Sequence, residues 1–402
     1  MVTAAFLLGY FFYIDWRIDI LNDKKIKLES EVRSLYIHFP FCKHICNYCD
    51  FFKKVPSDSY SLSSFHNLFK KQDVAHEKIL SKRGLRLGSL ETLYVGGGTP
   101  SLWGKEGSQF LKKFLSGKAL ELSKNGEYTL EVNPGTWTDE VISHWLKSGI
   151  NRFSVGIQSL DKRFLPILDR VHTLEDSFEL LNYFRLKNLN YSVDFMLGLP
   201  YSESLGRDVI KELNQILLYK PSHISLYILT TKESYVHQKE LPRDDWVADE
   251  YLKVSNFLTE NGFNHYEVSN FSLPGRESRH NLKYWNLDSV AALGPSGTGF
   301  LKGAVGGFRY KWNVHDSNMK EEPLSERELE LEKVYLNLRT FKGLGLSDVV
   351  SRGNDKALFS LIKEWRSKGY LRSAEGERLR LSSKGFLLLD SIMDDLFREK
   401  II

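Results

Sequence analysis

The chain has 402 residues, of which 42% are hydrophobic, so it is long enough for one domain of about 250 residues and a smaller second domain. Its formal net charge of +4 is small for this length, and no block of basic residues or basic stripe interleaved with aromatic residues stands out. Composition therefore excludes the strongly basic classes, and we expect no nucleic acid partner.

The first residues, MVTAAFLLGYFFYI, are apolar, but they lack the basic n-region and the small-residue cleavage site of a signal peptide. The run is also shorter than the roughly 20 residues that a membrane-spanning helix needs. We expect residues 1–33 to be an N-terminal extension of one of three kinds. It is an added packing segment, a peripheral contact with a membrane surface, or an overextended start of the reading frame.

The three cysteines of the chain, Cys42, Cys46 and Cys49, lie in one short loop after an apolar strand. An odd and clustered set argues against disulfides and for thiolates in a reducing compartment, so we expect a cytoplasmic protein. The spacing Cys-x3-Cys-x2-Cys lets three thiolates hold three irons of a cubane [4Fe-4S] cluster, and the fourth iron stays open for a ligand. The alternative is a structural zinc site completed by His38 or His44. Such sites usually carry a second CxxC or HxxxH pair, and none follows here.

Six short apolar or alternating runs, each bounded by glycine, proline or asparagine, predict strands. The predicted strands are 34–39, 90–95, 127–132, 152–157, 190–196 and 223–229, and helical periodicity lies between them at 61–80, 110–122, 139–147, 174–186 and 206–218. Strand and helix in alternation predict a parallel sheet, and the length of each unit suits a closed or partly closed barrel. We therefore expect an α/β fold with a partial (β/α)6 TIM-like barrel over residues 34–275.

Unusual residues end or follow these predicted strands. The cysteine loop follows the first strand, GGGTP at 96–100 follows the second, and Glu131, Gln158 and Asp194 lie at or near the ends of the next three. Functional groups in such barrels gather at the C-terminal ends of the strands, because the loops there converge on one mouth. We expect these residues to share one site.

The open iron of a cluster can chelate an amine and a carboxylate, which S-adenosylmethionine (SAM) presents, and one electron from the cluster would release a 5′-deoxyadenosyl radical. The glycines of GGGTP let the backbone approach a ligand closely, although a tight turn explains them equally well. Glu131 and Asp194 can accept from an ammonium or from ribose hydroxyls, and Arg170 can clamp a carboxylate. Each of these three alone is more simply a solvated or ion-paired residue, and their shared position favours a functional interpretation.

The pattern changes in the connecting segment 276–326, which contains HNLKYW at 280–285. His280 is a candidate haem ligand, because imidazole ligates porphyrin iron and Tyr284 and Trp285 could pack on a macrocycle, although a histidine hydrogen-bonded within a loop is commoner. Residues 327–402 predict helices around a two-stranded wing, hence a small C-terminal winged-helix-like α+β domain. Its basic residues alternate with acidic ones, so we expect it to pack on the barrel rather than bind DNA.

The segment from Tyr36 to Phe51 resembles the cluster loop of the radical SAM superfamily, including the aromatic Tyr48 before the third cysteine. Further matches follow in order along the chain: GGGTP, EVNPG, NRFSVGIQS, DRVH, DFMLGLP, HISLY, YEVSNF, RHNLKYW and LRLSSKGFLLLD. Together they resemble the HemN/HemW branch, which contains oxygen-independent coproporphyrinogen III oxidases and haem chaperones. The resemblance implies a radical SAM barrel.

The resemblance also implies the cofactors and their ligands. A [4Fe-4S] cluster would be held by Cys42, Cys46 and Cys49, and SAM would be contacted by Tyr36, Tyr48, Gly97, Gly98, Thr99, Glu131, Gln158, Arg170 and Asp194. Haem or a porphyrin would be the cargo, and HNLKYW resembles a motif associated with haem handling. The implied partner is a haem-acceptor protein, for example one of a respiratory chain.

Departures from the branch bear on function. The oxidases carry a further cysteine two residues after the third cluster cysteine, and this position is Phe51 here. That favours a chaperone over a coproporphyrinogen III dehydrogenase-type oxidoreductase that decarboxylates propionates to vinyl groups. Residues 294–298 lack the histidine of the usual GPxAH, and residues 229–234 have lost the usual LTxEPGT. Whether the chain is an enzyme therefore stays open, and a radical SAM enzyme acting on an unrelated substrate is a third alternative.

Overall fold

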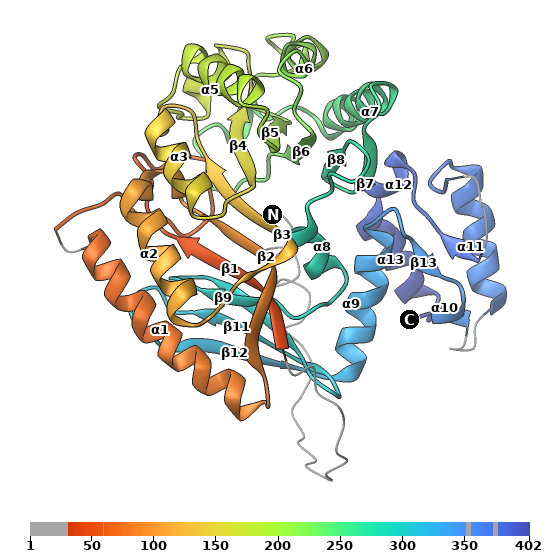
Figure 1. Cartoon of the computed structure of the whole chain (residues 1–402). Helices are drawn as coiled ribbons and strands as arrows, with labels where there is room; N and C mark the ends of the chain where they lie inside the picture. Colours follow the sequence, from red (N-terminus) through yellow and green to blue (C-terminus); the bar gives the residue numbers. More distant parts are fainter. Residues whose placement is uncertain (1–30, 59, 351–354, 373–376) are drawn as a thin grey trace.

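The computed structural model describes residues 31–58, 60–350, 355–372 and 377–402 (Figure 1). The expectations for the N-terminal extension fall almost entirely outside these residues. Among the residues described, no helix combines the length and the apolar character that crossing a membrane requires.

A nine-stranded sheet forms the centre of the molecule. Its six parallel strands, which pair in chain order, are β1 (Glu31–Phe39), β2 (Arg86–Gly97), β3 (Leu122–Val132), β4 (Arg152–Gln158), β5 (Tyr191–Leu197) and β6 (His223–Ile228). β9 (Ala291–Leu293) adds in parallel to β1, and β8 (Asn270–Ser272) and β7 (Asn264–Glu267) add antiparallel beyond β6. The sheet order ends at β7 and β9, so the barrel is open, and the predicted partial (β/α)6 architecture is confirmed.

Helices surround the outer face of the curved sheet in Figure 1. They are α1 (Leu62–Lys82), α2 (Gly104–Gly117), α3 (Asp139–Lys147), α4 (Phe164–Ile167), α5 (Leu174–Leu186), α6 (Val209–Leu217) and α7 (Asp244–Glu260), with 3-10 turns η3 (Pro100–Trp103) and η4 (Gln238–Glu240). The helix predicted over 110–122 is wrong in its second half. The chain leaves α2 after Gly117, Ala119 takes a left-handed φ of 50°, and β3 begins at Leu122. A left-handed residue ends a helix, and the prediction overlooked this turn.

The two faces of the sheet differ because side chains alternate along each strand. Outward-facing residues such as Leu93, Val155 and Val193 are fully buried in the main hydrophobic cluster. The inward-facing residues are mostly polar, namely Ser34, Tyr36, His38, Thr92, Tyr94, Glu127, Thr129, Glu131, Arg152, Ser154, Ser192, Asp194, His223 and Ser225. They contact one another, as when Ser154 Oγ lies 3.0 Å from Ser192 Oγ. The barrel therefore encloses a polar interior.

The helix α8 (Arg279–Trp285), formed by the HNLKYW segment, lies at the centre of Figure 1 and packs against β2. A separate antiparallel sheet follows, made of β10 (Thr298–Lys302), β11 (Gly307–Trp312) and β12 (Met319–Leu324). It is joined to the barrel through β9 and through His76 on α1, whose Nε2 lies 2.7 Å from the Tyr310 hydroxyl.

The C-terminal part has a hydrophobic cluster of its own. Its elements are α9 (Glu326–Leu338), β13 (Leu344–Gly345), α10 (Ser347–Val350), α11 (Asp355–Ser367), β14 (Arg378–Leu379), α12 (Ser383–Leu387) and α13 (Leu389–Arg398). Within the described residues, the two segments of the predicted wing are joined by an antiparallel bridge between Leu371 and Leu381 and by hydrogen bonds from Arg372 N to Arg380 O and from Ser382 N to Tyr370 O. β14 also pairs with β13. The predicted domain boundaries, and the winged-helix-like character of this part, stay predictions.

Candidate functional site

The cysteine loop lies at the C-terminal end of β1 and is closed by backbone hydrogen bonds. Cys42 N donates to Lys54 O over 2.9 Å, and Lys54 N donates to Pro40 O over 2.8 Å. All three cysteines are free thiols and partly exposed. Burial raises the pKa of the Cys42 and Cys46 thiols, so thiolates in this loop need positive charge close by, which irons supply.

Two glycines bring β2 into contact with β1 and the cysteine loop. Gly98 N donates to Phe39 O over 2.7 Å, and a Cβ at Gly98 would lie 2.5 Å from the carbonyl oxygen of Phe41. Gly97 has a φ of +115°, and a Cβ there would lie 2.7 Å from the ring of His38. Both contacts are closer than real Cβ atoms allow, so GGGTP does more here than form a tight turn.

Two carboxylates point into the barrel near its mouth. Glu131 accepts from the Tyr94 hydroxyl over 2.9 Å and from Gly97 N over 3.0 Å. Asp194 accepts from Ser154 Oγ, which lies 3.1 Å from both carboxylate oxygens. Burial, followed by the charge of Asp194, raises the pKa of Glu131 to about 7, and burial raises the pKa of Asp194 to about 6. Two acids with raised pKa values in one place are typical of a site that receives a cation.

A hydrogen-bond chain connects Arg170 to the cysteine loop. Arg170 Nη2 donates to Asn133 Oδ1 over 2.8 Å and to the Gly156 carbonyl over 2.9 Å, while its Nη1 lies 4.0 Å from Cys46 Sγ. Asn133 Nδ2 donates to Thr99 Oγ1 over 3.1 Å, and Thr99 Oγ1 lies 3.5 Å from Cys42 Sγ. Asn133 was not among the site residues predicted from the sequence. Its position directly after the third strand was a signal that could have identified it.

The remaining candidates lie around the same mouth. Gln158 ends β4 with a φ of +67°, a strained value for a residue with a side chain. Tyr48 packs against the small hydrophobic cluster formed by residues of α4 and of the loops after β5 and β6. The Tyr36 hydroxyl donates to His38 Nδ1 over 3.0 Å. The predicted cofactor residues thus surround one barrel mouth, and their roles toward a cofactor stay predictions.

His280 lies elsewhere, inside the barrel on α8. Its side chain is buried, its Nδ1 is 2.9 Å from Thr92 Oγ1, and its Nε2 has no hydrogen-bond partner among the described residues. Burial lowers the pKa of His280 to about 3, so the imidazole is neutral. Tyr284 packs on this imidazole, and Trp285 packs under the guanidinium of Arg339. Ligation of haem iron by His280 stays a prediction, and it requires α8 to move.

The histidines considered for a zinc site are engaged in other contacts. His38 Nε2 lies 2.9 Å from the Phe52 carbonyl oxygen, so Nε2 carries the proton and Nδ1 accepts from Tyr36. His44 Nε2 lies 2.8 Å from the carboxylate of Asp169. Within the part of the chain that the structure describes, no group of three or more His, Cys, Asp or Glu side chains is arranged to hold a single metal ion.

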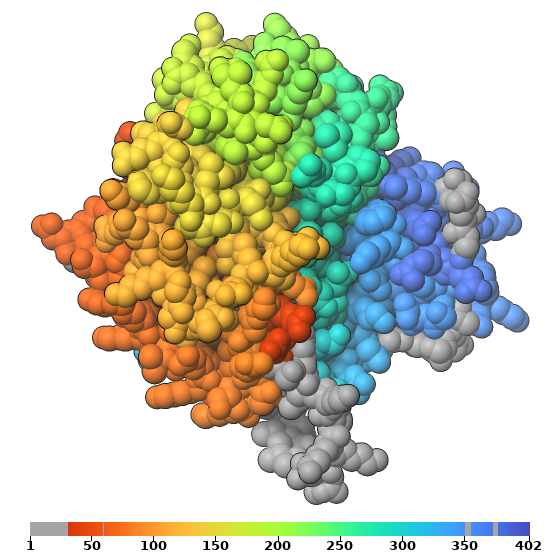
Figure 2. Space-filling model, in the orientation of Figure 1, coloured from red at the N-terminus to blue at the C-terminus, as the bar shows by residue number. Residues whose placement is uncertain are grey.

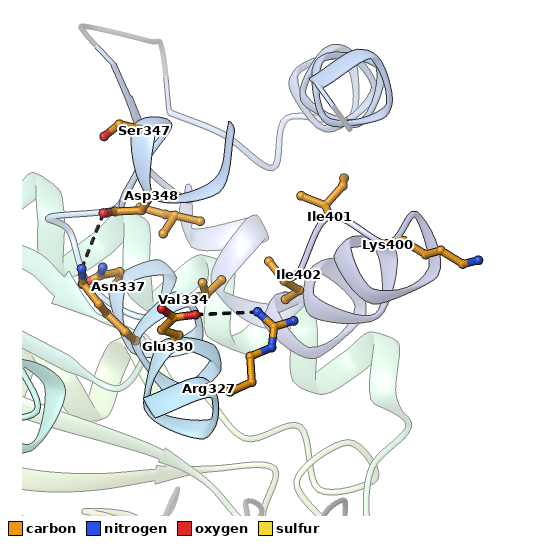
Figure 3. A pocket seen from close by; sticks show the side chains of 11 residues that line it. Arg327, Glu330, Val334, Asn337, Ser347, Asp348, Lys400, Ile401 and Ile402 are labelled. Atoms are coloured by element: carbon orange, nitrogen blue, oxygen red, sulfur yellow. Dashed lines mark ion pairs between the residues drawn. The ribbon is translucent and has the colours of Figure 1, made fainter. Parts of the chain in front are cut away.

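Two clefts of the described residues lie away from this site. One, of about 740 Å³, lies between α9, α10 and the C-terminal residues, and its Arg327–Glu330 and Lys333–Asp348 ion pairs largely neutralise it (Figure 3). The other, of about 610 Å³, lies between α7, β7 and the C-terminal part and contains His265. Neither cleft contains a cysteine or a candidate cofactor residue.

Comparison with known proteins gives consistent results. Residues 36–213 match the model of the radical SAM superfamily. The chain is 31% identical to the haem chaperone HemW of Lactococcus lactis subsp. lactis, covering 92% of this chain and 98% of that protein. It is 32% identical to the bovine mitochondrial radical S-adenosyl methionine domain-containing protein 1, covering 90% and 87% of the two chains. The fold is similar to that of Escherichia coli coproporphyrinogen III oxidase HemN, with a TM-score of 0.74, 19% identity and coverage of 92% and 91%.

The superfamily implies a [4Fe-4S] cluster and SAM, and the site has the features that both require. Three free thiols on one loop suit the cluster, and two buried acids of raised pKa, one of them hydrogen-bonded to Gly97 N, suit a cationic ligand. The similarity to HemW extends over nearly the whole of both chains. This chain belongs to the HemN/HemW branch of the radical SAM superfamily.

Proposed function

We propose that this protein is a haem chaperone of the HemW kind, which binds a [4Fe-4S] cluster, SAM and haem in the cytoplasm and passes the haem to an acceptor protein. The observation that carries the proposal is the similarity to a haem chaperone over 98% of that protein's length. Phe51 also favours a chaperone over an oxidase, because it stands where the oxidases have a further cysteine. The acceptor, which we expect in a respiratory chain, and a peripheral membrane contact belong to the same proposal.

The residues at the barrel mouth have distinct tasks in this proposal. Cys42, Cys46 and Cys49 would ligate the cluster, which together with SAM supplies one-electron chemistry. Glu131 would accept from the ammonium group of SAM, because its carboxylate is already held toward the mouth by Tyr94 and Gly97. Asp194 would accept from the ribose hydroxyls. Arg170, Asn133 and Thr99 hold the cysteine loop at a fixed distance from these acids.

The cysteine loop also offers a surface for the cargo. Ile45, Phe51 and Val55 are each about half exposed, with 45%, 45% and 46% of their surface accessible. Lys43 and Lys53 lie on the same loop. Haem is a flat apolar macrocycle with two carboxylates, so exposed apolar side chains and lysines on one loop match its chemistry.

The experiment reconstitutes the cluster anaerobically and adds a one-electron reductant and SAM, with either haem or coproporphyrinogen III. We expect a stable haem Soret band and no protoporphyrinogen. Formation of the vinyl product would instead establish the oxidase. Absence of both the Soret band and the product would favour a radical SAM enzyme acting on another substrate.

Three variants serve as controls for this experiment. Replacing the three cysteines by serine must abolish the brown chromophore, and it shows whether haem binding depends on the cluster. His280→Ala and His280→Phe together test the predicted ligand, because loss of the Soret band in both variants is expected if the imidazole coordinates the iron, whereas phenylalanine keeps a ring in place but cannot ligate. Unchanged haem affinity in His280→Ala would exclude His280 as the ligand and leave the chaperone proposal intact.

A further inference from the structure

The backbone that carries His280 is held in place from both sides. The first two amides of α8, on Arg279 and His280, donate to the buried carboxylate of Glu127 over 3.2 and 3.0 Å. His280 Nδ1 lies 2.9 Å from Thr92 Oγ1. The imidazole is therefore fixed in position against the inner face of β2 and β3.

Besides Tyr284 of α8 itself, two buried tyrosines of the sheet contact this imidazole. The ring centroid of Tyr94 lies 5.3 Å from that of His280, and the centroid of Tyr36 lies 6.4 Å from it. The two tyrosine rings are 6.1 Å apart, so the three rings form one aromatic cluster. No more than 8% of the surface of any of them is exposed, and a change in one ring must displace the others.

The two tyrosines of this aromatic cluster are hydrogen-bonded to different parts of the cofactor site, one to the carboxylate of Glu131 and the other, through His38, to the cysteine loop. The Tyr94 hydroxyl donates to Glu131, whose other oxygen accepts from Gly97 N. The Tyr36 hydroxyl donates to His38, whose Nε2–H donates to the Phe52 carbonyl within the cysteine loop. One imidazole thus supports both the acid of the SAM site and the loop that carries the cluster ligands.

We propose that His280 is a positioning residue of the cofactor site, whose ring sets the places of Tyr36 and Tyr94 and through them those of Glu131 and the cysteine loop. What matters in this role is the flat ring, since neither imidazole nitrogen contacts a tyrosine hydroxyl. The inference rests on the cluster and SAM that the superfamily implies, and it does not depend on haem binding. It also gives α8 a task while it stays inside the barrel.

The test compares a variant that removes the ring with one that keeps it. His280→Ala removes the ring, whereas the double variant His280→Phe/Thr92→Val keeps a ring and removes the hydroxyl that would lose its partner. One readout is hydrogen exchange of the backbone amides of residues 41–54 in cluster-free protein, and the other is the dissociation constant of SAM after anaerobic reconstitution. Lys283→Gln, on the same helix but outside the cluster of His280, Tyr36 and Tyr94, is the matched control.

We expect His280→Ala to speed exchange in the loop and to weaken SAM binding about tenfold or more, equivalent to about 1.4 kcal/mol. For the double variant and Lys283→Gln, we expect both the exchange rates of the loop and the dissociation constant of SAM to stay within about threefold of those of the unmodified protein. The proposal is wrong if His280→Ala changes neither readout, or if the double variant loses as much as His280→Ala. Should His280→Ala not fold, His280→Leu removes the aromatic ring with less loss of volume, and the same two outcomes are read from it and the double variant.

Haem binding of the same variants, followed by the Soret band, separates this inference from the proposed function. A protein that never binds haem but shows the expected SAM and exchange results refutes the chaperone and keeps the positioning role. If the protein binds haem while His280→Ala changes neither the exchange of the loop nor the SAM affinity, the chaperone proposal stands and the positioning role is refuted.

Discussion

At the scale of single residues, the cofactor site depends on places where a side chain is missing. Gly97 combines a positive φ with the ring of His38 where its Cβ would lie. An alanine there adds backbone strain and displaces an imidazole that is hydrogen-bonded at both nitrogens. This position couples the geometry of β2 to the cysteine loop.

We therefore expect Gly97→Ala to lower the free energy of unfolding by about 2–4 kcal/mol, because overpacking adds to the strain of a left-handed residue. Gly262→Ala is the matched control. Gly262 follows α7 and also has a positive φ, of +84°, but nothing lies within 4 Å of its Cβ position, so only the strain of a left-handed residue, about 1 kcal/mol, remains. Urea unfolding of the two variants measures the difference, and equal losses would contradict the close contact with His38.

Glu131 gives a pH dependence with a definite sign. It faces Tyr94 and Gly97 of β2 and Asp194 of β5, and its pKa is raised to about 7 by burial and by Asp194. An unfolded glutamate titrates near about 4.3. The folded state therefore binds the proton more tightly, and the free energy of unfolding falls as the pH rises from about 4.3 toward 7, by at most about 1.4 kcal/mol per pH unit.

The measurement is urea unfolding of the cluster-free protein between pH 5 and 8, compared with Glu131→Gln, which cannot titrate. We expect the unmodified protein to lose stability relative to the variant up to about pH 7 and then to run parallel to it. Because the charge of Asp194 helps to raise the pKa of Glu131, Asp194→Asn should move the loss of stability to lower pH. A difference that is flat across the range would show that Glu131 is not held as described.

At the scale of elements, the sequence predicted the six parallel strands of the barrel, but it did not predict the helix that lies inside the barrel. Apolar runs and turn residues locate β1 to β6, because a strand covered by helices must bury its outer side chains. β9 was missed since its three residues, Ala291–Leu293, carry no periodic signal. The interior placement of α8 was missed for a different reason. Its neighbours are Glu127 and Thr92, which are distant in sequence, and a short polar helix gives no amphipathic pattern.

The anchoring of α8 by Glu127 can be tested directly. Glu127 is buried, accepts from two helix amides and lies 3.9 Å from the buried guanidinium of Arg152. We expect Glu127→Leu to lower the free energy of unfolding by about 3–5 kcal/mol, because it leaves a buried cation and two amides without an acceptor. Thermal or urea unfolding checks this value. Glu91→Gln, which breaks the partly exposed pair with Lys283 on the same helix, should cost less than about 1 kcal/mol.

At the scale of the whole molecule, the C-terminal part is joined to the barrel by buried polar contacts. Val268 N donates to Arg339 O over 3.2 Å, and Phe341 N donates to Tyr266 O over 2.8 Å. In the space-filling view this part lies closely against the barrel segments around residues 250–300 (Figure 2). The sequence predicted packing instead of DNA binding from the mixed charges alone, but the residues that make the contact carried no signal, since a buried ion pair is indistinguishable from a surface one in sequence.

Arg339 and Glu267 form the central contact of this interface. Arg339 Nη2 lies 2.9 Å from Glu267 Oε2, both side chains are almost fully buried, and the guanidinium lies 4.3 Å from the ring centre of Trp285 at the end of α8. Arg339→Met should lower the free energy of unfolding by about 3–5 kcal/mol, because the carboxylate of Glu267 is then buried without its cation. Arg327→Met, which breaks an exposed pair on α9, should cost less than about 1 kcal/mol.

A double-mutant cycle separates the ion pair from simple packing. Glu267→Gln keeps an acceptor for Ser269 N, 3.0 Å away, while it removes the charge, so adding it to Arg339→Met should restore at least half of the lost stability. Strictly additive losses in urea unfolding would mean that the two side chains do not compensate each other. Because Trp285 ends the helix that carries His280, the rescue should also restore SAM affinity if Arg339 acts through α8. If stability returns and SAM affinity does not, the C-terminal part holds the fold together without influencing the cofactor site.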